Sequence, residues 1–308
     1  MAKVLILTDG KAGHENQSKA FARALGCAYE LRDIRFRSKW AKALSYFLDH
    51  LGIRTDRLFD CEADPDERER FQAVIGTGSG TFYAAKVFAH KLGVKCGVVL
   101  YPRGYRLSTF DCILAPAFDR PARRANVIEI PANLVAADAA FYADGVKAFK
   151  SRYDGASDRA VAVIVGGPNA CSTMSAEWMK KELDQVFADN KGAQFWVTTS
   201  RRTPPEVEAV VDSYPWDYRL IYSREHFNPI PAFVALAKRL YVTAESTGML
   251  SEACTSGTAE VLALDNLKPG PHKFRRFVDG LRRDGYLNGS RKVDLTEVIA
   301  EAKRRMGV

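Results

Sequence analysis

Short apolar runs alternate along this chain with longer amphipathic segments, and several of these runs end in a glycine-containing loop. VLILTDG (4–10) and VAVIVGG (161–167) show the pattern most clearly. Apolar runs of this length are typical of strands that are buried on both faces, and parallel strands need a crossover, usually a helix, between them. The alternation therefore predicts an α/β fold with parallel sheets.

The length of the chain favours two such folds in succession. A domain usually contains about 100–200 residues, and this chain has 308. The pattern stops at FKSRYDGASDRA (149–160), which is polar and lacks apolar periodicity, and it restarts at Val161. We therefore expect two Rossmann-like domains, residues 1–150 and 151–308, that face each other across a ligand cleft in the GT-B fold.

The expected elements of each half can be read from the same pattern. In the first half they are strands at 4–9, 28–34, 73–78, 96–102, 111–116 and 127–131, with helices at 15–25, 39–51 and 82–92. In the second half they are strands at 161–167, 193–200, 218–223, 239–245 and 259–264, with helices at 175–188, 205–213, 231–238, 248–255 and 295–305.

Composition restricts the class of partner. The net charge of +8 favours anionic partners, but no nucleic-acid-binding module is recognisable, so we expect no nucleic acid. The apolar segment at the N-terminus is too short for a signal peptide. We therefore expect a cytoplasmic protein, with peripheral attachment to the inner face of the membrane as an addition. The six cysteines contain no C-x-x-C pair, which argues against a zinc site.

The loop after the first strand is the best candidate for catalysis. Asp9 and His14 lie in it, and a helix is expected to begin near His14. A histidine in such a loop can take a proton from a hydroxyl near neutral pH. Alternatively, Asp9 caps the helix, and the amides of the loop are satisfied by neighbouring side chains. The residues expected on this acceptor side are Gly10, Lys11, Gly13, Asn16, Gln17, Gly78 and Ser79.

Gly78 and Ser79 belong to GTGSG (76–80), which lies between a strand and a helix. It lacks the third glycine of a dinucleotide site and the Lys-Ser/Thr of a P-loop. A tight turn with a polar contact is the favoured interpretation.

Three strand-end loops of the second half indicate a diphosphate site. GGPN (166–169) has glycines that permit close approach, and TTSRRTP (198–204) offers hydroxyls and guanidiniums. In ESTGMLSE (245–252) a helix opens after Ser246, and Glu252 can accept hydrogen bonds from ribose hydroxyls. The expected donor-binding residues are Gly166, Gly167, Thr199, Ser200, Arg201, Glu245, Ser246, Thr247, Met249 and Glu252.

No metal site or cofactor is expected. Asp64-Pro65-Asp66 matches the D-x-D metal motif but follows no strand, so a helix that begins at a proline explains it better. The five histidines show no metal-binding spacing.

One helical segment carries both basic and apolar residues. Trp40, Leu44, Phe47, Leu48 and Leu51 fall along one face of the expected helix 39–51, and basic residues crowd its start. An amphipathic helix that packs on the core is the favoured interpretation. The alternative is contact with anionic lipid or with a lipid-linked acceptor.

Three segments together resemble one protein family. LTDGKAGHENQS (7–18), VTTSRRTP (197–204) and VTAESTGMLSEA (242–253) resemble the mitochondrial-fission (elongated-mitochondria) family, whose bacterial members are often labelled nucleoside-diphosphate-sugar epimerases. At the level of the fold, the chain is also similar to the inverting glycosyltransferase that adds N-acetylglucosamine to a lipid-linked peptidoglycan precursor. Gly13-His14 matches the end of its first glycine loop, and Ser246–Ala253 matches its nucleotide-holding segment.

These resemblances imply a function. We expect an enzyme, a metal-independent inverting glycosyltransferase for hexosyl or N-acetylhexosaminyl transfer. It would use a nucleotide-diphosphate sugar and an acceptor that is lipid-linked or belongs to the cell envelope. His14 or Asp9 would be the base. The alternatives are a nucleotide-sugar epimerase on the same fold and a non-enzymatic, membrane-associated protein of the fission family.

Overall fold

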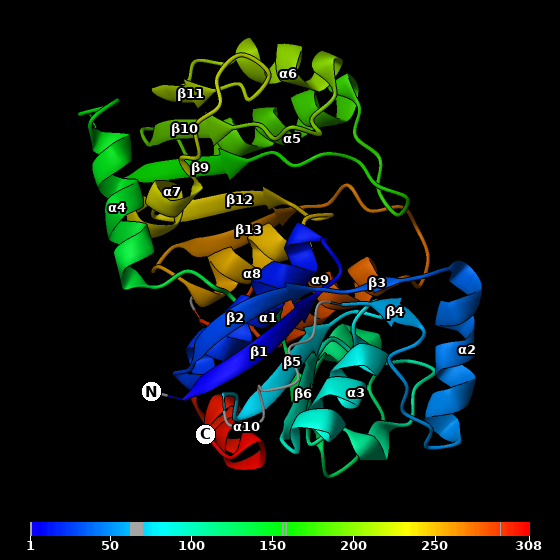
Figure 1. The fold of residues 1–308 in the computed structure, drawn as a ribbon. Helices are drawn as coiled ribbons and strands as arrows, with labels where there is room; N and C mark the ends of the chain where they lie inside the picture. Colours follow the sequence, from blue (N-terminus) through cyan, green and yellow to red (C-terminus); the bar gives the residue numbers. More distant parts are fainter. Residues whose placement is uncertain (1, 62–69, 156, 158, 290) are drawn as a thin grey trace. The chain divides into compact units, whose positions relative to one another are not determined.

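The computed structural model describes residues 2–61, 70–155, 157, 159–289 and 291–308 (Figure 1). It divides into two compact units, each described here by itself. Unit 1 contains Met1–Ile130, Leu134–Ala136 and Asp294–Val308, and unit 2 contains Pro131–Asn133 and Ala137–Val293. This division differs from the predicted boundary after residue 150, because residues 137–150 lie in unit 2 and residues 294–308 return to unit 1. The predicted cleft between the halves stays a prediction.

Unit 1 is built on a parallel sheet of six strands in the order β2-β1-β5-β6-β7-β8. The strands are β1 (Lys3–Thr8), β2 (Ala28–Asp33), β5 (Ala73–Thr77), β6 (Lys95–Val99), β7 (Cys112–Pro116) and β8 (Val127–Ile130). Every strand predicted in the first half is present, although β6 ends at Val99 rather than at residue 102. A two-stranded antiparallel ribbon of β3 (Arg35–Phe36) and β4 (Phe59–Asp60) was not predicted.

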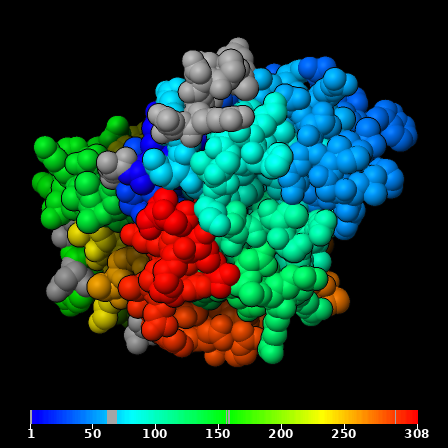
Figure 2. Space-filling model, turned by 60° about the horizontal axis from the view of Figure 1, so that its bottom comes forward, coloured from blue at the N-terminus to red at the C-terminus, as the bar shows by residue number. Residues whose placement is uncertain are grey.

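Helices cover both faces of this sheet, which explains why its strands are apolar throughout. Val4 and Ile6 pack in one core with α1 (Ala12–Leu25) and α10 (Thr296–Met306). Leu5 and Leu7 point to the opposite face and pack with α3 (Phe82–Leu92). Figure 2 shows the C-terminal residues, in red, on the surface of unit 1 beside its blue-green segments. Short 3-10 helices occur at Leu107–Thr109 and Ala117–Asp119.

Unit 2 repeats the architecture with a parallel sheet of five strands in the order β11-β10-β9-β12-β13. The strands are β9 (Ala160–Ile164), β10 (Gln194–Thr198), β11 (Tyr218–Leu220), β12 (Arg239–Thr243) and β13 (Glu260–Leu264). The helices are α4 (Ala139–Lys150), α5 (Ala176–Asp189), α6 (Pro205–Asp212), α7 (Ile230–Leu236), α8 (Thr247–Thr255) and α9 (Lys273–Arg283). All five strands and four of the helices coincide with predicted elements.

The prediction of a domain linker at 149–160 is wrong. Phe149 lies in the last turn of the unpredicted helix α4 and is fully buried, with its ring centre 5.2 Å from that of Trp196 in β10. Gly145 lies in the middle of α4, where glycine disfavours a helix. A Cβ at Gly145 would lie 2.5 Å from Pro231 Cβ. The close packing of α4 on α7 therefore requires this glycine, and the sequence pattern alone hides the helix.

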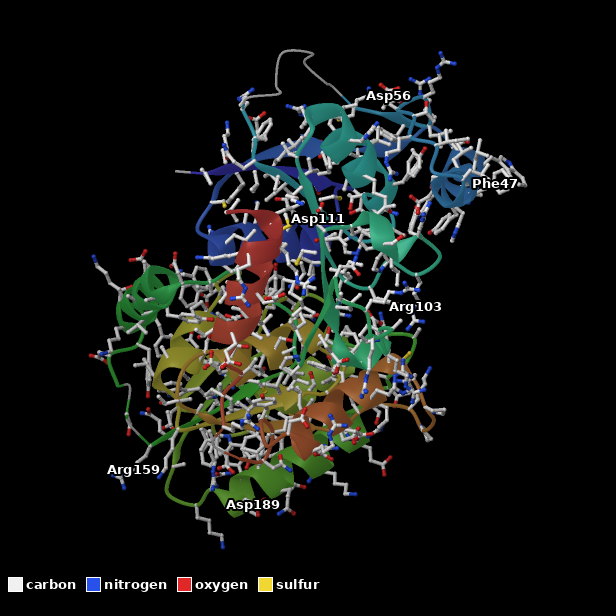
Figure 3. The ribbon with its side chains drawn as sticks, turned by 90° about the horizontal axis from the view of Figure 1, so that it is seen from below. Phe47, Asp56, Arg103, Asp111, Arg159 and Asp189 are labelled. Atoms are coloured by element: carbon white, nitrogen blue, oxygen red, sulfur yellow. The ribbon has the colours of Figure 1, made fainter. Side chains whose placement is uncertain are left out.

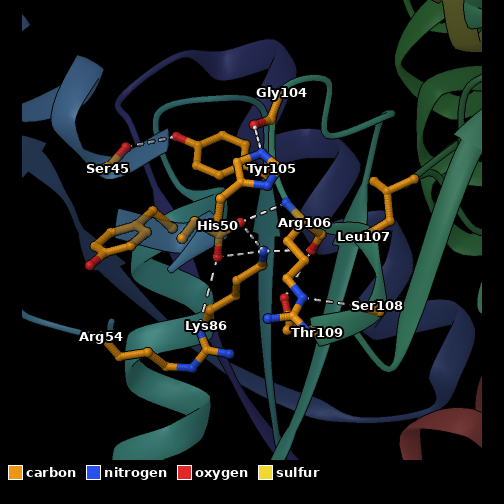
Figure 4. Close-up of polar contacts among 12 residues, drawn as sticks. Ser45, His50, Arg54, Lys86, Gly104, Tyr105, Arg106, Leu107, Ser108 and Thr109 are labelled. Carbon is orange, nitrogen blue, oxygen red and sulfur yellow. Dashed lines mark hydrogen bonds and ion pairs between the residues drawn. The ribbon is translucent and has the colours of Figure 1, made fainter. Parts of the chain in front are cut away.

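The interpretation of residues 39–51 as a helix that packs on the core by its apolar face is confirmed only for Leu48, which packs against the core of unit 1. Helix α2 (Lys39–His50) buries Ser45 and Asp49, whereas Trp40, Phe47 and Leu51 are exposed. Asp49 accepts hydrogen bonds from Lys86 Nζ at 2.8 and 2.6 Å and from the Arg106 amide at 2.7 Å (Figure 4). The polar face of α2 therefore holds it against α3. No helix among the described residues has the length and apolarity to span a membrane.

Candidate functional site

In both sheets the strand order reverses once, and most of the predicted functional residues follow the strands at that point. In unit 1 the reversal lies between β1 and β5, because β2 is on one side of β1 and β5 to β8 are on the other. In unit 2 it lies between β9 and β12. In open α/β sheets ligands bind at the carboxyl ends of the strands at this position. The topology thus marks one candidate region in each unit.

In unit 1 the loop after β1 and the first turn of α1 bring Asp9 and His14 together. His14 Nδ1 lies 3.0 and 3.1 Å from the two oxygens of Asp9. The carboxylate therefore favours the tautomer that carries the proton on Nδ1 and leaves Nε2 as the free base. The side chain of His14 keeps about a quarter of its surface accessible. This arrangement is suited to taking a proton from a ligand.

The Asp9 carboxyl is held in its ionised form. Burial opposes ionisation, but the hydrogen bonds and charges of Lys11 and His14 lower the pKa of Asp9 below its ordinary value. Lys11 Nζ lies 3.0 Å from Asp9 Oδ2. Lys11, predicted on the acceptor side, is thus a partner of the predicted base.

The glycine loop after β5 makes room for this pair. A Cβ on Gly78 would lie 2.3 Å from the His14 ring, and one on Gly80 would lie 2.7 Å from Asp9. Gly78 also has a φ of +82°, which disfavours other residues. The hydroxyl of Ser79 accepts a hydrogen bond from Lys42 Nζ of α2 at 2.9 Å. The loop is therefore a tight turn with a polar contact, and it seats the Asp9–His14 pair.

The other residues predicted on the acceptor side are less closely grouped. Gly10, Gly13 and Asn16 are exposed, and a Cβ on Gly13 would meet nothing within 4 Å. Gln17 instead donates to the Leu134 carbonyl at 2.8 Å and accepts from the Leu134 amide at 3.0 Å. Gln17 therefore anchors residues 134–136 to α1, a structural role.

In unit 2, Glu245 is the centre of a buried network after β9 and β12. Glu245 is 2% exposed, and its Oε1 accepts a hydrogen bond from the Gly167 amide at 2.9 Å. Asn266 Nδ2 donates to its Oε2 at 2.7 Å. A Cβ on Gly166 would lie 2.0 Å from Glu245 Oε1. Glu245, Gly166 and Gly167 therefore fix the ends of these strands, and the glycines are required by the packing of the protein itself.

The loop after β10 divides into a buried part and an exposed part. Thr199 is buried and donates to Glu208 Oε1 at 2.9 Å, whereas Arg201 is exposed. Thr203 Oγ1 donates to the Gly166 carbonyl at 2.6 Å and accepts from the Ser200 amide at 2.8 Å. Thr203 thus holds this loop to the end of β9. The exposed side chain of Arg201 has no hydrogen-bond or ion-pair partner among the described residues.

Helix α8 begins at the same edge of the sheet. Ser246 is its N-cap, but its side chain forms no capping hydrogen bond. Among the described residues, no acceptor is found for the backbone amides of Thr247, Gly248 and Met249. The N-terminus of a helix attracts anions through such amides. A Cβ on Gly248 would meet nothing within 4 Å, so the surface over these amides is open.

Glu252 lies one turn further along α8. Its Oε1 accepts a hydrogen bond from Tyr142 of α4 at 3.2 Å. Burial raises the pKa of Glu252, although the Tyr142 hydroxyl opposes this shift. Glu252 Oε2 has no partner among the described residues, so it can accept from a ligand.

Four contributors to these regions were missed by sequence reasoning: Lys42, Tyr142, Glu208 and Asn266. Glu208 could have been found, because it lies beside Val207 and Val211 on the apolar stripe of α6. Tyr142 was hidden with α4. Lys42 and Asn266 approach their partners only through the tertiary fold. No cluster of three metal-ligating side chains occurs in the part of the chain that the structure describes, and Asp64-Pro65-Asp66 lies outside it.

The two units and their sheets define the fold of this protein. Two parallel α/β units of this kind form the GT-B fold. The UDP-GlcNAc 2-epimerase of Neisseria meningitidis, solved with UDP-GlcNAc, matches over 99% of this chain and 98% of its own, at 12% identity and a TM-score of 0.52. A putative UDP-N-acetylglucosamine 2-epimerase from Listeria monocytogenes covers 99% and 88%, at 12% identity and a TM-score of 0.53. At such identities the likeness shows the fold alone.

The particular family follows from the sequence. The model of the mitochondrial fission ELM1 family matches residues 12–303, and the chain belongs to this family. The uncharacterized protein RP120 of Rickettsia prowazekii is 30% identical over 103 residues. That match spans 31% of this chain and 29% of the relative.

Proposed function

We propose that this protein transfers a sugar from a nucleotide-diphosphate donor to a hydroxyl acceptor. The observation that supports the proposal most directly is the Asp9–His14 pair at the strand reversal of unit 1. A histidine whose Nδ1 is held by a carboxylate, and whose Nε2 contacts no polar group among the described residues, has the form of a general base.

The proposed reaction requires one proton transfer and one displacement. His14 Nε2 takes the proton of the acceptor hydroxyl, and the acceptor oxygen forms a bond to the anomeric carbon of the sugar. The bond from that carbon to the diphosphate oxygen breaks, and its electron pair leaves with the nucleoside diphosphate. Attack from the side opposite the leaving group inverts the anomeric configuration. Asp9 stabilises the imidazolium that forms.

The second unit would bind the donor. The free amides of α8 and the exposed guanidinium of Arg201 are suited to the diphosphate. Glu252 would accept from the ribose through its unengaged oxygen. Glu245, Gly166, Gly167 and Thr199 would position these groups without contacting the donor, because other residues of the unit surround them.

Substitution of His14 tests the proposal. A thermal-shift screen first identifies the nucleoside diphosphate that binds. His14→Ala should then lower the rate of sugar transfer from the corresponding nucleotide-diphosphate sugar by about 10²–10⁴-fold. Donor affinity by calorimetry should not change, since His14 is placed on the acceptor side. His90→Ala is the matched control, because His90 is exposed near the end of α3 remote from β5. Full transfer by His14→Ala would contradict the proposal.

Isomerisation of a nucleotide sugar is the second candidate, because the Neisseria and Listeria neighbours are described as epimerases. Incubation of a UDP-sugar without acceptor separates the two. An isomerised sugar would favour an epimerase, and a product that requires an acceptor would favour transfer. Absence of any nucleotide binding would favour a non-enzymatic protein and overturn both.

A further inference from the structure

The outer face of α2 is apolar, and none of the described residues covers it. Trp40 is 84% exposed and Phe47 is 62% exposed, and Leu44, Leu51 and Ile53 are also exposed. Figure 3 shows Phe47 on the side of α2 that points away from the sheet of unit 1. Residues 40, 44, 47 and 51 follow a spacing that places them on one helical face. These five residues are called the α2 face below.

The exposure of the α2 face is a consequence of how the helix is held. Asp49 and Lys86, both with fully buried side chains, form an ion pair behind it. Ser45 lies 3.0 Å from the Tyr105 hydroxyl, and the rings of Tyr46 and Tyr105 stack with centroids 4.2 Å apart. These contacts fix the rotation of α2 about its axis. The helix therefore presents its apolar side to solvent in a defined orientation.

Positive charge flanks the α2 face at both ends. Arg35 and Lys39 are exposed at its start. At its end His50 Nε2 lies 3.1 Å from the carbonyl of Gly104, which follows Arg103 in the chain. Arg103 is exposed, and its guanidinium donates to the Asp119 carbonyl. The acidic residue within 39–53 is Asp49, which is buried and paired. Figure 3 shows Arg103 on the same side of the unit as Phe47.

We propose that the α2 face binds an anionic lipid bilayer, with the helix lying in the plane of the interface. Aromatic and leucine side chains on one face of a helix, with basic residues around them, are the features of such helices. A helix of 12 residues is too short to cross a bilayer, which needs about 20. A second copy of the chain is the poorer occupant, since either pairing of two α2 faces would bring basic residues together. This inference is independent of the proposed sugar transfer.

Co-sedimentation with vesicles tests the proposal. The native chain should bind vesicles of three parts phosphatidylcholine to one part phosphatidylglycerol, and bind pure phosphatidylcholine weakly. Trp40→Ser/Phe47→Ser/Leu51→Ser should lower binding by roughly tenfold or more. Arg35→Gln/Lys39→Gln should lower it less and remove part of its salt dependence. Leu31→Ser/Phe141→Ser, which alters exposed apolar residues elsewhere, should bind as the native chain does.

A second measurement locates the contact. Lipids with brominated acyl chains should quench the fluorescence of Trp40, and Trp40→Phe, which keeps the face apolar, should lose that quenching. Circular dichroism should be the same for all variants, because the replaced side chains are exposed. Unchanged vesicle binding by the triple variant would overturn the proposal. A native dimer that the triple variant converts to a monomer would assign the face to a second copy and would also overturn it.

Discussion

Asp49 and Lys86 form a buried pair of opposite charges in unit 1. Lys86 donates to both oxygens of Asp49 and to the Arg106 carbonyl at 2.8 Å, and it lies 4.1 Å from the centre of the Phe110 ring. Burial lowers the pKa of Lys86 to about 8, although the Asp49 carboxylate opposes the change. The pair is costly to bury and costly to break. It acts as a specific connection between α2 and α3.

Removal of one partner should therefore be harmful, and removal of both should be tolerated. Lys86→Met should lower the free energy of unfolding by roughly 3–5 kcal/mol, since the Asp49 carboxylate would lose its buried cation. The double variant Asp49→Leu/Lys86→Met should recover most of that loss. Urea denaturation measures both. Lys91→Met, on the exposed side of α3, should change stability by less than about 0.5 kcal/mol. A double variant less stable than Lys86→Met would contradict this account.

Glu252 makes stability depend on pH. Its pKa is raised in the folded chain, so the folded state favours the protonated carboxyl. Its contribution to stability is greatest below the unfolded pKa and is lost as the pH rises through the folded pKa. Glu252→Gln should therefore gain stability over the native chain between about pH 4 and pH 8. Urea titrations across that range measure the difference.

The control for this pH dependence is Glu129→Gln, because Glu129 is exposed in β8. A pH dependence that both variants shared would not come from the buried Glu252 carboxyl. A Glu252→Gln difference that shrank as the pH rose would show that the native environment favours the charged form, contrary to the structure.

At the scale of the elements, a substitution at the open N-terminus of α8 should change the stability of the chain and its nucleotide binding in opposite directions. Gly248 lies in the first turn, where a Cβ would meet no atom of the protein. Gly248→Ala should therefore raise stability by up to about 1 kcal/mol, because alanine restricts the unfolded chain more than glycine does. If the diphosphate sits on the α8 amides, the added methyl group should weaken nucleotide binding severalfold.

Gly280→Ala supplies the matched comparison. Gly280 lies in α9, and a Cβ there would have its nearest atom at 4.0 Å. This variant should gain stability as Gly248→Ala does, with no change in calorimetric binding. If both variants bound the nucleotide equally well, the proposal that the diphosphate binds at the α8 amides would be contradicted.

Across the whole molecule, the last helix returns to the first unit. Met306 of α10 is fully buried, and a Cβ on Gly97 of β6 would lie 2.6 Å from its Cε. Unit 1 therefore depends on the C-terminal residues of the chain for one face of its core. Unit 2 has its own core, in which Met179 and Leu183 of α5 are fully buried.

The packing of Met306 in unit 1 predicts that its loss destabilises unit 1 and not unit 2. Met306→Ala should lower the stability of unit 1 by about 2–5 kcal/mol through the cavity that it leaves. Hydrogen exchange should then show lost protection in β1, β5 and β6, with β9, β10 and β12 unchanged. Arg304→Ala, an exposed change in the same helix, should leave both sets protected. Equal losses in the two units would indicate that they unfold together.

The strands and most helices were predictable, because local periodicity determines them. Buried parallel strands such as β1 and β9 are apolar on both faces, and the glycine and polar residues that follow them mark where they end. Asp9 and Glu245 lie in strand-end loops, and His14 and Glu252 lie in the helices that follow these loops, so all four could be found for the same reason. The sequence by itself therefore determined the fold class and the loops in which a ligand site can lie.

The tertiary structure decided what those loops and helices do. Glu245 proved to be enclosed and Gln17 to be an anchor, because their partners, Asn266 and Leu134, are distant in the sequence. The apolar stripe of α2 faces outward because Asp49 pairs with Lys86, 37 residues away. The sequence shows which faces of an element are polar or apolar. Which face is buried depends on contacts with residues that are distant in the sequence. The free energy gained by burying a face depends on the surface against which it packs as much as on the face itself.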